Sequence, residues 1–395
     1  MIMIRNPHRA FEEHVAAWES ISYSGNFSSD FVAMIKYCIV NGNVEHYHRK
    51  NFDMADEPYG INVSHIVDLE EKTAILVDHA LSVIEPATQH WQWLYEKLND
   101  LDSRMLLLTI IAYRSIGWRY VRMPLDSHAF WNCMKRLSEL ESYSQPVSDH
   151  YLADIIAGRL KIINLDKFGI EIKLLSEAFG VFNEFIYSQY SYRGRNDIIG
   201  PKEGDYVFDC GACFGGTSLH FAERVGKSGR VISYEFFPEN VDILSYNLKI
   251  NPDLEKLITV VEKPVWSQSG ITMHIEGSGP ATQVFVGENA TGREKRTDYR
   301  EFQSTTIDDT VFCLDLQRVD FIKMDIEGSE MMALRGAVDT IKKERPTLAI
   351  SVYHKLFDFY EIPQFIDGLD LGYKFYLQHS TVHGDETVIF ASVKN

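Results

Sequence analysis

The chain contains 395 residues, of which 45% are hydrophobic and 12% aromatic, so it is long enough for two or three domains with a sizeable core. Its formal net charge of -17 argues against a nucleic-acid partner, whose phosphates need lysine and arginine, and against docking on anionic lipid. The longest apolar run, MLLLTIIAY, is far shorter than the roughly 18 residues that a membrane helix requires.

The N-terminal stretch and the cysteines both favour a cytoplasmic protein. The sequence MIMIRNPHRAFEEH carries a charge at Arg5 and has no apolar run of the kind found in a signal peptide. The five cysteines are an odd number in mostly apolar surroundings, which is typical of reduced thiols rather than of a disulfide framework. We therefore expect a cytoplasmic chain without an integral membrane segment.

The first half of the chain has a helical pattern. The segments HWQWLYEKLNDLDSRMLLLTIIAYRSIG and HAFWNCMKRLSELES carry apolar residues at helical spacing. A strand-like passage, GIEIKLLSEAFGVFNEFIYSQYSYRGRND, leads into the second half. We expect residues 1–195 to form a mainly helical N-terminal region.

The second half, residues 196–395, alternates strand and helix patterns. The predicted strands are YVFDC, RVISYEFF, LITVVEKPVW, VDFIKMDI, TLAISVYH, YKFYLQH and ETVIFASV, and the predicted helices span 215–225, 238–250, 327–343 and 359–371. Such alternation predicts parallel strands with right-handed crossovers, and the short turn between the last two strands predicts an antiparallel hairpin. Residues 271–310 interrupt the alternation and predict a small β insertion.

A glycine-rich loop, VFDCGACFGG, follows the first of these strands and opens a helix, as a nucleotide-binding loop does. Gly211 allows a tight turn, and Glu235 closes the next strand, where a carboxylate can bind ribose hydroxyls. The pattern fits NAD or S-adenosylmethionine. In the dinucleotide motif Cys213 would replace the glycine that approaches the pyrophosphate, so the loop favours the phosphate-free S-adenosylmethionine. A structural turn without cofactor remains an alternative.

The pair Cys210 and Cys213 also reads as C-x-x-C. A zinc site needs four ligands, and no second cysteine or histidine pair lies at close spacing. A redox pair would sit at this kind of strand-to-helix turn, but the side chain of Cys210 is expected to point away from that of Asp209. We therefore interpret the cysteine pair as incidental.

With FIKMDIEGSE added, the second half resembles the FkbM family of S-adenosylmethionine-dependent methyltransferases. The matching segments run in family order over residues 200–395: VFDCGACFGGTSLHFA, VISYEFFPENVDILSYNLKIN, VVEKPVWSQSG, TTIDDTV, FIKMDIEGSEMMALRGA, LAISVYHKLFDFYEIPQFI, YKFYLQHS and ETVIFASV. More weakly, AFGVFNEFIYSQY and IAYRSIGWRYVRMPL resemble longer members that are often associated with polysaccharide or lipopolysaccharide gene clusters. The sequence departs from the family pattern at Cys210, Ala212 and Cys213.

The resemblance implies O-methylation, commonly of a sugar hydroxyl, with S-adenosylmethionine as donor and S-adenosylhomocysteine as product. It implies a Rossmann-like class I methyltransferase sheet of seven strands with the last strand antiparallel. Residues 1–195 would then shape acceptor access or mediate oligomerisation, and residues 196–395 would form the methyltransferase domain. The expected partners are a small-molecule or glycan acceptor and a second copy of the chain, but no nucleic acid.

The candidate cofactor-binding residues lie at or beside the expected carboxyl ends of the strands. Asp209 is expected on the methionine side, Glu235 at the ribose, and Trp266 beside the adenine, although Trp266 fits a plain core position equally well. The full set is Asp209, Gly211, Ala212, Cys213, Gly215, Glu235, Phe236, Val265, Trp266 and Asp325.

The candidate catalytic residues are Asp325, Glu327 and His354. Asp325 closes an otherwise apolar strand, where the transferred methyl group should lie. A neutral His354 could take the proton of the acceptor hydroxyl, with a structural histidine as the alternative. Glu327 or Ser329 could simply cap the following helix, which is the favoured role for Ser329.

A metal site is not expected. Metal-dependent relatives of this architecture place an acidic pair after the fifth strand, where this chain has Tyr353, His354 and Lys355; Asp325 with Glu327 leaves the possibility open.

Residues outside these motifs have weaker assignments. Tyr190 and Tyr192 precede the second half and could cover the cofactor, although packing within this linker between the two halves is favoured. His383 and Glu386 belong to the last hairpin and could meet the acceptor, although a solvated turn is favoured.

Three functions compete at this level. The first is a methyltransferase acting on a hydroxyl of a sugar or polysaccharide precursor. The second is an NAD-dependent oxidoreductase on a sugar substrate, and the third is a non-catalytic binding protein whose helical half carries the function.

Overall fold

The computed structural model describes residues 18, 21, 23–41, 59–142, 152, 160–195, 197–276, 283–286 and 300–393. The N-terminal stretch used to argue against a signal peptide lies outside these residues, as do parts of the predicted β insertion. Among the described residues, no helix is both long and apolar enough to cross a membrane. All five cysteines are free thiols, with Cys213 and Cys313 exposed.

The N-terminal region is mainly helical, as predicted. Its helices are α2 (Phe27–Asn41), α3 (Leu69–Ile84), the short η2 (Glu85–Ala87), α4 (Thr88–Lys97), α5 (Leu101–Ile116) and α6 (His128–Ser142). The long helical pattern at residues 90–117 is divided because Asp100 caps α5, its side chain accepting a hydrogen bond from the backbone N–H of Ser103 at 2.8 Å.

The passage before the second half is less strand-like than predicted. Two hairpins form, from β1 (Lys161–Asn164) with β2 (Lys173–Ser176) and from β3 (Tyr192–Arg193) with β4 (Ile198–Ile199), and η3 (Leu165–Phe168) joins the first pair. Between the hairpins lie α8 (Ala178–Val181) and the π-helical segment η4 (Phe182–Tyr187). This part is helical because its buried residues recur three or four positions apart, at Ala178, Val181, Phe182 and Phe185.

The second half forms the predicted seven-stranded sheet. Its strands are β5 (Tyr206–Cys210), β6 (Arg230–Tyr234), β7 (Ile258–Val261), β11 (Phe321–Met324), β12 (Thr347–Ser351), β13 (Lys374–His379) and β14 (Thr387–Ser392). They run in the order β13-β14-β12-β11-β5-β6-β7. β14 alone is antiparallel to its neighbours, which confirms the Rossmann-like class I methyltransferase architecture.

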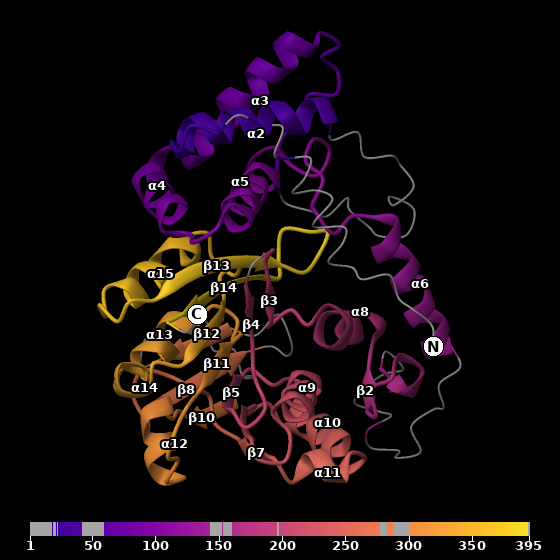
Figure 1. Cartoon of the computed structure of the whole chain (residues 1–395), viewed down its shortest axis with the longest axis vertical. Coiled ribbons are helices and arrows are strands. Elements are labelled where there is room, and N and C mark those ends of the chain that lie inside the picture. Colours follow the sequence, from indigo (N-terminus) through magenta and orange to yellow (C-terminus); the bar gives the residue numbers. More distant parts are fainter. Residues whose placement is uncertain are drawn as a thin grey trace.

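Helices cover both faces of this sheet (Figure 1). One side carries α9 (Gly216–Val225), α10 (Pro238–Lys249) and α11 (Pro252–Glu255), and the other carries α12 (Ile307–Cys313), α13 (Glu330–Arg335), α14 (Val338–Glu344) and α15 (Asp358–Asp367). The helix predicted at 327–343 is therefore two helices that meet at Gly336. The predicted insertion contains an antiparallel sheet of β8 (Thr272–Glu276), β9 (Gln283–Val286) and β10 (Arg300–Gln303).

The N-terminal helices pack on the β13 edge of the sheet and share its core (Figure 1). A parallel bridge joins Leu98 to Phe375, and the backbone N–H of Leu377 donates to Ser103 Oγ at 2.9 Å. On the same side, Lys97 Nζ lies 2.7 Å from Asp367 Oδ2 of α15. Arg114 of α5 also donates to the carbonyls of Tyr353 and Gly384, so the helical region borders the loops at the carboxyl ends of β12 and β13.

Candidate active site

The glycine-rich loop turns tightly between β5 and α9. Backbone N–H groups of Gly211 and Ala212 both donate to the carbonyl of Tyr234, at 3.1 and 2.9 Å. Gly211 has φ 89°, and a Cβ there would overlap the carbonyl oxygen of Asp325. Only glycine fits this position, because it must combine positive φ with close backbone contact. The contact places the loop directly beside the residue that follows β11.

Cys213 also adopts a left-handed conformation, with φ 47°, and Gly215 caps α9 with φ 83°. A left-handed cysteine is a strained residue, and such residues cluster at functional sites. Cys213 is exposed whereas Cys210 is fully buried, so the two thiols lie in different environments and the pair has no joint role in this geometry.

The carboxylate of Asp209 is occupied by groups of the protein itself. It is fully buried, with Lys323 Nζ 3.0 Å from Oδ1 and the hydroxyl of Ser218 donating to Oδ2 at 2.6 Å. Ser233 donates in turn to Ser218 at 2.8 Å. Direct contact of Asp209 with the methionine part of a cofactor remains a prediction; the geometry favours an indirect role in holding the loop.

Lys323 is one of the residues that sequence reasoning missed. It lies in the centre of the sheet, opposite Asp209 in the β5–β11 register, and donates to the carbonyl of Gly211 at 2.6 Å and to that of Cys210 at 3.2 Å. Burial opposes its charge, but Asp209 and Asp325 outweigh burial and raise the pKa of Lys323. The available signal was a lysine inside the apolar strand FIKM.

Glu235 lies at the end of β6, where the ribose was expected. Its Oε1 accepts hydrogen bonds from the backbone N–H groups of Phe236 and Phe237, at 2.8 and 2.9 Å. Burial raises its pKa, while these hydrogen bonds act in the opposite direction. Phe236 and Trp266 are half-buried in one small apolar cluster with Phe237, so both border the region expected for an adenine ring. Val265, in contrast, is buried in the main core.

Asp325 follows β11, and its carboxylate accepts hydrogen bonds from two tyrosines. The hydroxyl of Tyr190 donates to Oδ2 at 2.7 Å, and that of Tyr353 donates to Oδ1 at 3.2 Å. Burial opposes ionisation of Asp325, but the charges of Lys323 and His354 and the Tyr190 hydrogen bond prevail, so its pKa lies below the ordinary value. Tyr190, expected to pack in the linker, therefore belongs to the site.

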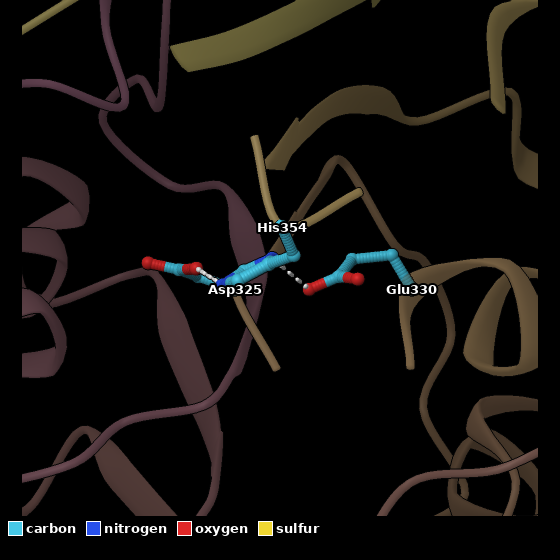
Figure 2. Close-up of side chains that lie close together, drawn as sticks. All are labelled: Asp325, Glu330 and His354. Atoms are coloured by element: carbon cyan, nitrogen blue, oxygen red, sulfur yellow. Dashed lines mark ion pairs between the residues drawn. The ribbon is translucent and has the colours of Figure 1, made fainter. Parts of the chain in front are cut away.

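His354 lies between carboxylates, as Figure 2 shows for Asp325 and Glu330. Its Nε2 is 3.6 Å from Asp325 Oδ1 and 3.4 Å from Glu327 Oε2, and its Nδ1 is 3.2 Å from Glu330 Oε1. Burial lowers its pKa, but the three carboxylates prevail and raise it to about 9. The expected neutral imidazole is therefore wrong for this arrangement, because the ring is charged at neutral pH.

Glu327 is the most exposed acid of this group. Its side chain is 35% exposed, and its backbone is left-handed with φ 56°. Burial of the remainder raises its pKa to about 7, with His354 acting in the opposite direction. A carboxylate with this pKa is poised to exchange a proton near neutral pH.

Asp325, Glu330 and His354 lie close enough together to suggest metal ligands, with one donor atom of each within 4.8 Å of the others. The arrangement does not suit a metal ion, since the two ring nitrogens face different carboxylates (Figure 2). Glu330 also accepts the backbone N–H of Ile326 at 2.8 Å. The geometry describes an ion-paired histidine, and the expectation of no metal stays a prediction.

Of the remaining candidates, Glu386 approaches the site while Tyr192 does not. Glu386 is half-buried with φ 57°, and burial together with the charge of Asp325 raises its pKa well above the usual range. Tyr192 packs instead against Tyr376 of β13 and Phe390 of β14. The backbone N–H of His383 donates within the turn, to Thr381 Oγ1 at 3.1 Å.

The sheet order and the loop beside Asp325 define the class of a Rossmann-like enzyme that binds a nucleoside cofactor. Residues 209–375 match the family model of the methyltransferase FkbM domain. This part of the chain therefore belongs to the FkbM methyltransferase family. The predicted family, and for this domain a methyltransferase that uses S-adenosylmethionine, are confirmed. No curated protein sequence gives a significant match.

Several solved structures are similar at low sequence identity. A methyltransferase FkbM from Methylobacillus flagellatus is 19% identical, with a TM-score of 0.48, over 80% of this chain and 61% of that one. The fibrillarin of Aeropyrum pernix, crystallised with natively bound S-adenosyl-L-methionine, is 14% identical, with a TM-score of 0.31, over 59% of this chain and 94% of that one. An S-adenosylmethionine-dependent methyltransferase from Aquifex aeolicus is 15% identical, with a TM-score of 0.29, over 49% of this chain and 84% of that one.

Proposed function

We propose that the chain transfers a methyl group from S-adenosylmethionine to a hydroxyl oxygen of a sugar or of a polysaccharide or lipopolysaccharide precursor. The observation that carries the proposal is the contact of Gly211 with the backbone of Asp325, which joins the cofactor loop and the acidic cluster in one site. The backbone N–H of Asp325 also donates to the carbonyl of Cys210 at 3.0 Å.

The charges around the loop support S-adenosylmethionine over a dinucleotide. Asp209, Glu235 and Asp325 surround the loop, and Lys323 is the buried cation among them. A pyrophosphate would add negative charge there, and the side chain of Cys213 would stand in its path. A sulfonium and an ammonium group would instead offset the carboxylates.

When bound, S-adenosylmethionine supplies an activated methyl group, so the protein has to align the acceptor and receive one proton. We assign the proton to Glu327, because its carboxylate is partly exposed and its pKa lies near neutrality. Asp325 and Glu330 hold the charged His354, and His354 in turn holds Glu327. His354 is thus a positioning residue, and no metal takes part in this scheme.

The acceptor that suits this site is a neutral or amino sugar. Asp325 is held in its ionised form beside Glu327, and its negative charge repels a phosphate-bearing acceptor. The hydroxyls of Tyr190 and Tyr353 add hydrogen-bonding groups of the kind that sugar hydroxyls require.

We assign the N-terminal region a role in acceptor access. Arg114 of α5 donates to the carbonyl of Gly384 at 3.1 Å through Nε and to that of Tyr353 at 3.0 Å. One residue of the helical region thereby holds the two loops beside the acidic cluster. A cytoplasmic location and self-association remain proposals alongside it.

Mass spectrometry tests the function directly. The full chain is incubated with S-adenosylmethionine and a panel of neutral, amino and nucleotide-linked sugars. We expect a gain of one methyl group on a hydroxyl of a neutral or amino sugar. With Glu327→Gln the rate of methylation should fall by about 100-fold or more. Methylation confined to nucleotide-linked sugars would contradict the acceptor assignment, and full activity of Glu327→Gln would contradict the role of Glu327.

A further inference from the structure

A carboxylate from outside the family-matched residues lies against the start of α9. Glu184 belongs to the π-helical segment η4, which packs on α9. A Cβ on Gly216 would overlap the carboxylate of Glu184, whose Oε1 and Oε2 are the atoms nearest to that position. Because Gly216 has no side chain, it leaves the space that this carboxylate occupies. Glu184 thus reaches the cofactor loop from η4, in the linker that precedes the methyltransferase domain.

The carboxylate of Glu184 has one buried oxygen without a hydrogen-bond partner. The hydroxyl and the backbone N–H of Thr217 both act on this carboxyl group and lower its pKa. Its Oε2 is buried and makes no hydrogen bond within the described part of the chain. A buried carboxylate oxygen without a partner is costly, so this atom is a candidate ligand for a positively charged group.

The protein supplies too little positive charge for this carboxylate. Lys323 is the cation among the main groups that act on Glu184, and Lys323 already pairs with Asp209. Burial and the charge of Asp209 raise the pKa of Glu184 to about 8. The protonated form of this carboxyl is therefore favoured at neutral pH, and a positively charged group bound beside it, such as that of the amino-acid part of S-adenosylmethionine, would favour the ionised form.

We propose that Glu184 binds the α-ammonium group of the methionine part of S-adenosylmethionine through Oε2. The inference rests on the proposed function and deepens it, because it assigns a cofactor ligand to the linker rather than to the methyltransferase domain. The ammonium group has three donors and a positive charge, and it would satisfy the unpartnered oxygen.

The competing role is purely structural, with Glu184 capping α9 through Thr217. Glu184→Gln separates the two roles, because the amide oxygen can still accept from Thr217 while the negative charge is lost. The ligand can be altered in the same way. 5′-Methylthioadenosine lacks the whole amino-acid part, and the deaminated analogue of S-adenosylhomocysteine lacks only the amino group.

Titration calorimetry with the full chain tests the inference. We expect the wild-type chain to bind S-adenosylhomocysteine about 10- to 100-fold more tightly than its deaminated analogue, as for a hydrogen bond to a charged group. Glu184→Gln should bind the two ligands alike, and its affinity for 5′-methylthioadenosine should match that of the wild type.

The possible failures are distinguishable. If the wild type binds S-adenosylhomocysteine and its deaminated analogue equally, the inference is overturned without recourse to any variant. If Glu184→Gln weakens all three ligands equally, Glu184 is structural and the inference is again overturned. If the wild type binds none of the three ligands, the proposed function itself fails.

Discussion

Two aspartates end neighbouring strands of the sheet, and their surroundings differ. Asp209 is the penultimate residue of β5 and has a closed set of partners, with Lys323 at 3.0 Å and Ser218 at 2.6 Å. Asp325 follows β11 and meets tyrosine hydroxyls and His354, all from segments outside the two strands. The first carboxylate is fully buried, and the second is partly accessible.

The strand register explains why the two acids are related. Lys323 lies opposite Asp209, and Asp325 lies two residues further along, on the same face. One lysine thus acts on both carboxylates, and what covers each of them sets its role. Ser218 of α9 closes off Asp209, whereas Asp325 stays partly accessible.

The largest expected effect comes from removing the shared lysine. Lys323→Met leaves Asp209 buried without its cation, so we expect a loss of about 3–5 kcal/mol in the free energy of unfolding, measured with denaturant. The double variant Asp209→Asn, Lys323→Met should recover part of this loss. An unfolding free energy of Lys323→Met within about 1 kcal/mol of the wild type would show that the buried charge of Asp209 does not depend on Lys323.

Gly211→Ala tests the contact between the loop and Asp325. We expect a loss of about 2–5 kcal/mol in unfolding free energy, since left-handed strain and overlap with the Asp325 carbonyl add together, and a loss of cofactor binding. Gly372→Ala is the matched control, because Gly372 has φ 78° with open space around it. It should cost about 1–2 kcal/mol and leave cofactor affinity intact. Equal costs for the two variants would argue against the close contact.

The sheet could be predicted from the sequence, but its interruptions could not. Seven strand-like runs that alternate with helical ones suffice for a mainly parallel sheet, and the short final turn suffices for its antiparallel hairpin. Gly336 lies between α13 and α14, where a Cβ would overlap the carbonyl of Trp266, and this contact joins segments 70 residues apart. The π-helical segment was read as strand-like because its aromatic residues fit either period.

The site residues that follow strand ends in the family motifs could be predicted. Asp325, Glu327 and His354 were expected at adjacent strand ends, and the structure brings them together. The charge of His354 was not predictable, since it depends on Glu330, which is buried at the start of α13. Glu184 could not be found either, because only the fold places it beside Gly216.

The pH dependence of His354 gives the next effect in size. Carboxylates raise its folded-state pKa to about 9 from an ordinary value of 6.5, so they stabilise the fold most below pH 6.5, and this stabilisation is lost as the pH rises through about 9. NMR titration of the imidazole should show a midpoint near 9, and Glu330→Gln should lower it. The unfolding free energy of His354→Gln should approach that of the wild type at high pH. A midpoint near 6.5 would contradict the ion-paired state.

Arg114→Lys is expected to have the smallest effect. It keeps the charge but loses the forked donors that hold the carbonyls of Gly384 and Tyr353, so we expect a loss of about 1 kcal/mol. Amides of the loop at 380–387 should exchange faster by mass spectrometry, while cofactor affinity stays unchanged. Unchanged exchange in this loop would remove the support for a positioning role of α5.

Calorimetric titration of the full chain with S-adenosylhomocysteine and with NAD tests the central claim, that the loop and the Asp325 cluster form one methyltransferase site. The account predicts binding of one S-adenosylhomocysteine per chain, no binding of NAD, and retained affinity in Glu327→Gln, because Glu327 acts on the acceptor. Binding of NAD without binding of S-adenosylhomocysteine would contradict it.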